Sequence, residues 1–130
     1  MDLMRRQDFL TLLQKPGGTA VSIYMPTHRV ADMEGDPLLL RHLLDEAETR
    51  LIQKGLKTAE ARNLLSPARE LLRDALFWQH QEEGLALFIS QSSFSQYNLP
   101  FEVPETVVAS EEYHIKPLLP LVISDGVVVS

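Results

Sequence analysis

Residues 37–76 constrain the fold most, because apolar side chains recur there at helical spacing on both sides of Gly55. Asp36 and Pro37 form a favourable helix start, with an N-cap acid followed by proline at the first helical position. The spacing predicts a helix from this start to about Lys54. Its buried stripe is expected to comprise Leu40, Leu43, Leu44, Ala47 and Leu51.

Beyond Gly55 the same periodicity predicts two shorter helices. One covers residues 59–65 after a Thr58 cap, and the other begins at Ser66, which precedes a proline. The buried stripe of the latter is expected to comprise Ala68, Leu71, Leu72, Ala75 and Leu76. The segment therefore predicts an antiparallel helical hairpin with its bend at residues 55–66.

Strand-like patterns flank the hairpin at residues 19–25, 84–90, 93–99 and 105–110. The first alternates in polarity, whereas 84–90 is apolar on both faces, as is typical of a central strand. We expect Ile23, Leu87 and Phe88 to be buried in this sheet. Trp78 lies beside the helical stripe, so we expect it to be partly buried and to cover the strand at residues 85–89.

Two short helices are predicted near the ends of the chain, one ending near Gln14 and one over about Lys116–Ile123. Together these elements indicate an α+β fold with two layers. About four strands form a mostly antiparallel sheet that packs against the long helical hairpin, with the short terminal helices added.

The charge distribution is asymmetric, although the chain as a whole carries a net charge of −6. Residues 1–73 contain 11 basic and 10 acidic residues, whereas residues 74–130 contain one basic residue and 8 acidic ones. Phosphate binding depends on Lys and Arg. An anionic partner should therefore contact the first half of the chain.

Residue types that bind metals or perform catalysis are sparse. The chain has no cysteine, which excludes disulfides and thiolate sites. No two histidines have the i, i+4 spacing that puts two ligands on one helix face; the four are His28, His42, His80 and His114. We therefore expect no metal, no cofactor, no small-molecule substrate and no enzymatic activity in this chain alone. Because no apolar run approaches the ~20 residues of a membrane span, we expect a soluble, cytoplasmic protein.

The pattern Asp32-x-Glu34-x-Asp36 resembles the beginning of a calcium-binding loop. Such a loop requires glycine at its sixth position and glutamate at its twelfth. Pro37 and Leu43 stand at these positions. We therefore interpret this segment as a solvated loop.

Four segments together resemble a known family: VSIYMPTHR, DPLLLRHLLDEAETRL, DALFWQHQEEGLALF and YHIKPLLPL. They are similar, in order and spacing, to the amino-terminal domain of bacterial release-factor-like proteins, which are related to archaeal and eukaryotic class 1 peptide-chain release factors. The resemblance runs from about Gly18 to Leu121. It implies that residues 1–124 form this domain and that residues 125–130 begin a linker or a middle domain. In the family, the catalytic Gly-Gly-Gln loop belongs to the middle domain.

Three motifs read the stop codon in the family, and each is only partly matched. The Gly-Thr-Ser motif matches Gly18 and Thr19. The Thr-Ala-Ser-Asn-Ile-Lys-Ser motif falls on residues 58–64, where only Thr58 and Ala59 match. The Tyr-x-Cys-x-x-x-Phe motif keeps only its aromatic end, at Tyr113. The resemblance therefore favours ribosome rescue, recycling or dormancy, without stop-codon discrimination.

Two functional hypotheses follow. In the first, the domain binds the ribosome or ribosomal RNA through four cations near the hairpin bend: Arg50, Lys54, Lys57 and Arg62. These cations are also compatible with ordinary solvated helix ends, where they stabilise the helix dipole. In the second, the chain is a protein-interaction or homo-oligomerisation domain that does not contact the ribosome and uses its acidic second half.

Overall fold

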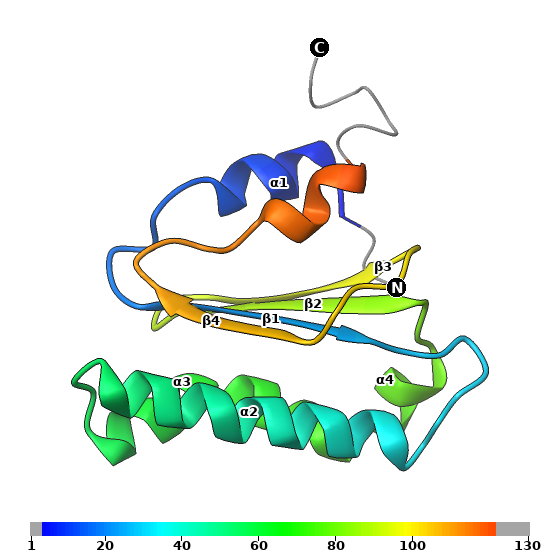
Figure 1. Ribbon diagram of the computed structural model, residues 1–130, viewed down its shortest axis with the longest axis horizontal. Helices are drawn as coiled ribbons and strands as arrows, with labels where there is room; N and C mark the ends of the chain where they lie inside the picture. Colours follow the sequence, from blue (N-terminus) through cyan, green and yellow to red (C-terminus); the bar gives the residue numbers. More distant parts are fainter. Residues whose placement is uncertain (1–3, 122–130) are drawn as a thin grey trace.

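The computed structural model describes residues 4–121, in which a four-stranded sheet lies between two helical layers (Figure 1). The longer elements are α1 (Arg6–Leu12), β1 (Ala20–Pro26), α2 (Gly35–Gln53), α3 (Thr58–Glu70), α4 (Ala75–Gln79), β2 (Gly84–Ile89), β3 (Phe94–Leu99) and β4 (Thr106–Ser110). Two short 3-10 turns complete them, η1 (Leu71–Arg73) and η2 (Lys116–Leu118). None of the helices in residues 4–121 combines the length and the apolar character that a membrane span requires.

The sheet has the order β3-β2-β1-β4, and each neighbouring pair of strands is antiparallel. Ile23 in the central strand β1 lies opposite Leu87 of β2 and Val107 of β4. The α+β class and the four expected strands are confirmed, each to within one residue at its ends. Because helices cover both faces, β1 and β2 are buried on both sides, as the apolar pattern of β2 predicted.

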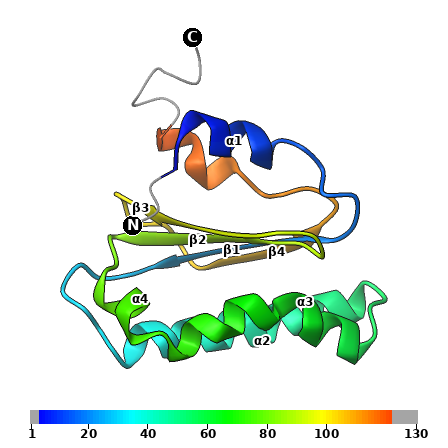
Figure 2. The same ribbon diagram turned by 180° about the vertical axis from the view of Figure 1, so that it is seen from behind.

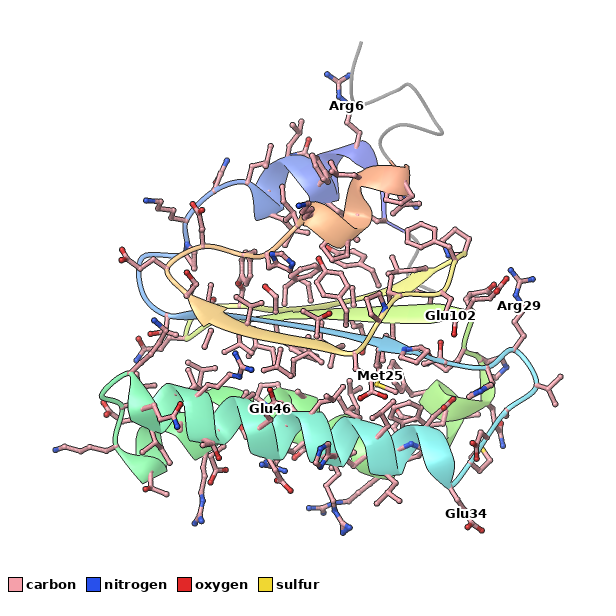
Figure 3. All side chains as sticks on the ribbon, in the orientation of Figure 1. Arg6, Met25, Arg29, Glu34, Glu46 and Glu102 are labelled. Carbon is pink, nitrogen blue, oxygen red and sulfur yellow. The ribbon has the colours of Figure 1, made fainter. Side chains whose placement is uncertain are left out.

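The helical hairpin of α2 and α3 packs on one face of the sheet (Figure 1). Its core contains Leu44, Leu51 and Leu65 from the helices, packed with Ile23 and Leu87 from the sheet. In Figure 3 the side chain of Met25 points from β1 into the space between the sheet and this layer. The predicted stripe of the first hairpin helix is therefore confirmed as the inner face of α2.

The other face of the sheet is covered by α1 and η2, which Figure 2 shows side by side above the strands. Phe9 and Leu118 from these segments pack with Tyr24 and Phe88. The hydroxyl of buried Tyr24 donates a hydrogen bond to the backbone carbonyl of His114. The terminal helices thus add a further layer to the two that were expected. The end of the predicted helix Lys116–Ile123 and the expected boundary at residues 125–130 lie outside the described residues.

The hairpin bend is tighter than predicted, because α3 is one helix where two were expected. Ser66 does not begin a helix; its hydroxyl donates a hydrogen bond to the carbonyl of Asn63 at 3.0 Å. This is the carbonyl that Pro67, which has no N–H, leaves without its helical donor. The helix therefore continues through Pro67, and the bend is confined to residues 54–57, called the hairpin turn below. Gly55, with φ +109°, ends α2 there.

The buried stripe predicted beyond Leu71 was wrong in part. Leu72 is half-buried, Ala75 is exposed and 68% of Leu76 is exposed. The reason is a change of helical phase, because η1 and the extended backbone of Asp74 separate α3 from α4. Trp78 takes the inward position and is only 2% exposed, not partly buried as predicted. It belongs to the same core cluster as Leu85 and Leu87, in the strand that it was expected to cover.

Candidate functional site

A groove of about 360 Å³ lies at the end of the molecule that contains the hairpin turn. Its walls come from the segment before β1, from the hairpin and from the segment after β2. The lining residues are Gly18, Thr19, Leu56, Glu60, Asn63, Leu64, Pro67, Ser90 and Gln91. Figure 1 and Figure 2 both show these segments at one end of the sheet. We call this feature the groove.

The antiparallel pairing of β1 and β2 explains why two of these segments meet. Val21 lies opposite Ile89, so the residues that precede β1 lie beside those that follow β2. The third wall is α3, which lies in the hairpin layer on one face of the sheet and contacts β2. Fold topology thus brings Thr19, Asn63 and Ser90 to one place although they are far apart in the sequence.

Hydrogen bonds among serines fix the turn that carries Ser90 and Gln91. The Ser90 amide donates to the Ser93 carbonyl at 2.8 Å, and the Ser93 amide donates to the Ser90 hydroxyl oxygen at 3.1 Å. The hydroxyls of Ser93 and Tyr113 lie 3.4 Å apart. This turn holds Gln91 exposed at the rim of the groove.

The groove offers a set of hydrogen-bonding groups. Thr19 and Ser90 supply hydroxyls, Asn63 an amide and Glu60 a carboxylate, beside apolar Leu64. Among the described residues, its lining contains no histidine, lysine or cysteine. Such a set suits recognition of a polar planar group by its edges.

The four cations expected to bind RNA are not equivalent. Arg50 pairs with Glu46 at 2.8 Å, and Arg62 lies 3.4 Å from Glu48. Within residues 4–121, neither Lys54 nor Lys57 forms an ion pair, and both are exposed. The free positive charge of the set is therefore concentrated in the two lysines of the hairpin turn.

Acidic residues of α2 neutralise much of the remaining hairpin surface. The Arg69 guanidinium bridges Asp45 at 3.0 Å and Glu48 at 3.3 Å. Glu48 thereby pairs with cations from two positions of α3, Arg62 and Arg69. These contacts link α2 to α3 across the hairpin. Because each pair is at least partly exposed to solvent, it contributes about 1 kcal/mol or less to stability.

The structure brings together some of the motif-matched residues and separates others. Gly18 and Thr19 line the groove. Thr58 and Ala59 form the exposed first turn of α3, next to Glu60, which does line it. Tyr113 is half-buried among the residues of the opposite face of the sheet, with its ring 5.5 Å from that of Phe88.

Sequence reasoning missed Ser90 and Gln91. They follow an apolar strand within a short polar turn, and neither matches a motif. The pairing of β2 with β1 is the signal that would have revealed Ser90 and Gln91, because it places the turn after β2 beside Gly18 and Thr19. Asn63 was considered only within an unmatched motif segment, yet its position on α3 faces the groove.

No protein-family model matches this chain, and neither does any curated protein. Among solved structures, one named "Archaeal protein" is similar, with a TM-score of 0.62 and 14% sequence identity. The match covers 94% of this chain but 37% of that one. The likeness supports the fold described above, and the chain spans well under half the length of this structural relative.

Proposed function

We propose that this chain is a ribosome-associated domain of a translation factor, which acts in the cytoplasm in rescue, recycling or dormancy. The observation that carries the proposal is the groove beside the hairpin turn. Gly18 and Thr19 line this groove, and they match one decoding motif of the family that the sequence resembles. Glu60 and Asn63 also line it, and they belong to the segment that aligns with a second decoding motif of that family.

The distribution of charge also favours RNA binding at the end of the molecule that contains the hairpin turn and the groove. Lys54 and Lys57 are exposed cations without acidic partners in the described part of the chain, and they are the first and last residues of the hairpin turn, next to the groove. Lysines so placed can contact phosphates while the groove presents hydrogen-bonding groups to bases. Phosphate contacts position a complex and base contacts specify it.

The groove also supports the loss of stop-codon discrimination. Where the family motif has Asn-Ile-Lys-Ser, this chain has Ala61, Arg62, Asn63 and Leu64. Ala61 is buried in the core, and Arg62 is held near Glu48. The domain thus keeps a surface for RNA while it lacks the residues that the family uses to read a codon.

Co-sedimentation of the full-length protein with ribosomes tests the proposal. We expect wild-type protein to pellet with ribosomes, and a variant with Asn63→Ala and Gln91→Ala to pellet less. Gln79→Ala is the matched control, because Gln79 is exposed in α4, at the other end of the sheet (Figure 1). If the wild-type protein stays in the supernatant at low salt, the ribosome proposal fails.

A second candidate is a protein-interaction domain. It is favoured by an apolar hollow of about 490 Å³ on α2, lined by Leu38, Leu39, Arg41 and His42 among others. Leu38 is 61% exposed there, and an exposed apolar patch often marks a binding surface. Light scattering on wild-type protein and on Leu38→Glu tests it. This function is favoured if the wild-type protein is larger than a monomer and the Leu38→Glu variant is a monomer.

A further inference from the structure

Three potential metal ligands converge at the end of the molecule opposite the hairpin turn. His28 follows β1, Asp32 lies in the loop after it, and Asp36 is in the first turn of α2. One ligand atom from each residue lies within 4.8 Å of the other two. We call these residues the His-Asp-Asp cluster.

Backbone hydrogen bonds hold Asp32 in the cluster. Its Oδ1 accepts from the amide of Gly35 at 2.8 Å and more weakly from that of Glu34 at 3.4 Å. The absence of a side chain at Gly35 allows this approach, because a Cβ there would collide with the other carboxylate oxygen of Asp32. Asp32 is therefore positioned although it is exposed.

Asp36 supplies an independent indication of a ligand. It is only 3% exposed, and its Oδ2 has no hydrogen-bond partner among the described residues. Its other oxygen lies 2.9 Å from Nδ1 of His28, so the carboxylate faces the cluster. A buried carboxylate oxygen without a partner is costly. A bound cation would compensate for that cost.

The distances fit one ion. Ligand atoms that each lie about 2.1 Å from a tetrahedral cation are about 3.4 Å apart. Nδ1 of His28 and Oδ1 of Asp36, which are 2.9 Å apart, would need to separate by only about 0.5 Å to hold one ion. One ligand atom of Asp32 lies within 4.8 Å of those of His28 and Asp36, so all three residues can reach the same ion.

We propose that His28, Asp32 and Asp36 bind a single divalent cation of the zinc class. One imidazole and two carboxylates give three protein ligands and leave a fourth position open to water. The imidazole favours Zn²⁺ over Mg²⁺ and Ca²⁺, which prefer oxygen ligands throughout. The ion would join the loop after β1 to the start of α2.

This arrangement differs from the calcium-loop pattern in the sequence, and the proposal departs from the expectation that the chain binds no metal. Glu34, the middle residue of that pattern, points away from the molecule (Figure 3). The third ligand is His28, which lies before the pattern. The unsuitable residues Pro37 and Leu43 therefore do not bear on this site. The inference does not depend on the proposed ribosomal function.

Isothermal titration of the full chain, free of affinity tags, with ZnCl₂ tests the proposal. We expect saturable binding of one Zn²⁺ per chain and little response to MgCl₂. Asp32→Asn keeps an oxygen for the Gly35 amide but removes the charge, and His28→Gln removes the imidazole. Each should weaken Zn²⁺ binding by more than about tenfold, since even changes to supporting groups cost about 10–100-fold.

His42→Gln is the matched control, because His42 is an exposed histidine on α2 outside the cluster. It should bind Zn²⁺ as the wild type does. Both ligand variants alter exposed side chains, and circular dichroism will establish that they are folded. The proposal is overturned if wild-type protein shows no saturable Zn²⁺ binding. It is also overturned if folded Asp32→Asn and His28→Gln bind like wild type.

Discussion

The indole N–H of Trp78 donates a hydrogen bond to the backbone carbonyl of Leu71 at 2.7 Å, within the core. The bond spans the break between α3 and α4 and fixes how α4 returns toward the sheet. Trp78 also packs edge-on against Phe77, with ring centroids 4.9 Å apart. The only tryptophan of the chain is thus a structural residue, which leaves no exposed indole for base stacking.

Trp78→Phe should destabilise the domain by about 1–3 kcal/mol, because it removes the buried indole hydrogen bond to the Leu71 carbonyl, which keeps only the Asp74 amide as donor, and it leaves part of the space of the indole unfilled. Urea unfolding monitored by circular dichroism measures this change. In the wild type, indole emission should be blue-shifted and resistant to iodide. Quenching by an added oligonucleotide would contradict the buried position.

Truncation of leucines along the second half of the hairpin should have graded effects. Leu65→Ala should cost about 2–5 kcal/mol, since Leu65 is fully buried. Leu72→Ala should cost less, because Leu72 is half-buried, and Leu76→Ala should change stability by no more than about 0.5 kcal/mol. Equal costs for Leu65 and Leu76 in urea unfolding would refute the change of helical phase.

Tyr24 should make the domain sensitive to alkali. Burial raises the pKa of its phenol well above the ordinary value of 10.0. The unfolded chain releases this proton above about pH 10, whereas the folded chain retains it. Stability should therefore be constant from this source below pH 10 and fall as the pH rises further.

Tyr24→Phe removes that titrating group, so its unfolding free energy should fall less steeply between pH 9 and about pH 11. It should also be less stable at pH 8, because the His114 carbonyl loses the hydroxyl that donates to it. Urea titrations at the three pH values measure both effects. Parallel pH profiles for the two proteins would exclude Tyr24 as the source.

Periodicity predicted the elements well where the apolar residues of one element share one face. The inner stripe of α2 is an example, since burial follows directly from the helical period there. The alternation of β1 predicted the strand itself, although helices bury both of its faces. It failed where the backbone changed phase. The sequence from Ala68 to Leu76 fits one continuous stripe, and nothing in the pattern shows that Asp74 adopts an extended backbone.

The site was predicted only in part, for a different reason. Gly18 and Thr19 came from the resemblance, but the groove also needs residues that only strand pairing brings near them, such as Ser90. Ion pairs with residues of the same hairpin decide which cations are free. Arg62 looked equivalent to Lys57 in the sequence until the structure placed Glu48 beside it.

Charge reversal at the hairpin turn should separate these cations by function. If the turn contacts ribosomal RNA, Lys54→Glu with Lys57→Glu should weaken ribosome association of the full-length protein. It should also lower the salt dependence, by about one unit of the log–log slope for each phosphate that the variant no longer neutralises. Reversal of Arg50 and Arg62 should weaken association less, because Glu46 and Glu48 already neutralise them. The free energy of unfolding of the lysine variant should change by less than about 1 kcal/mol, since both side chains are exposed.

Arg5→Glu with Arg6→Glu is the control at exposed cations of the opposite layer, where Figure 3 shows Arg6 pointing away from the molecule. Should the lysine variant co-sediment like the wild type from low to high salt, the hairpin turn is not a contact surface, and the protein-interaction function becomes the better proposal.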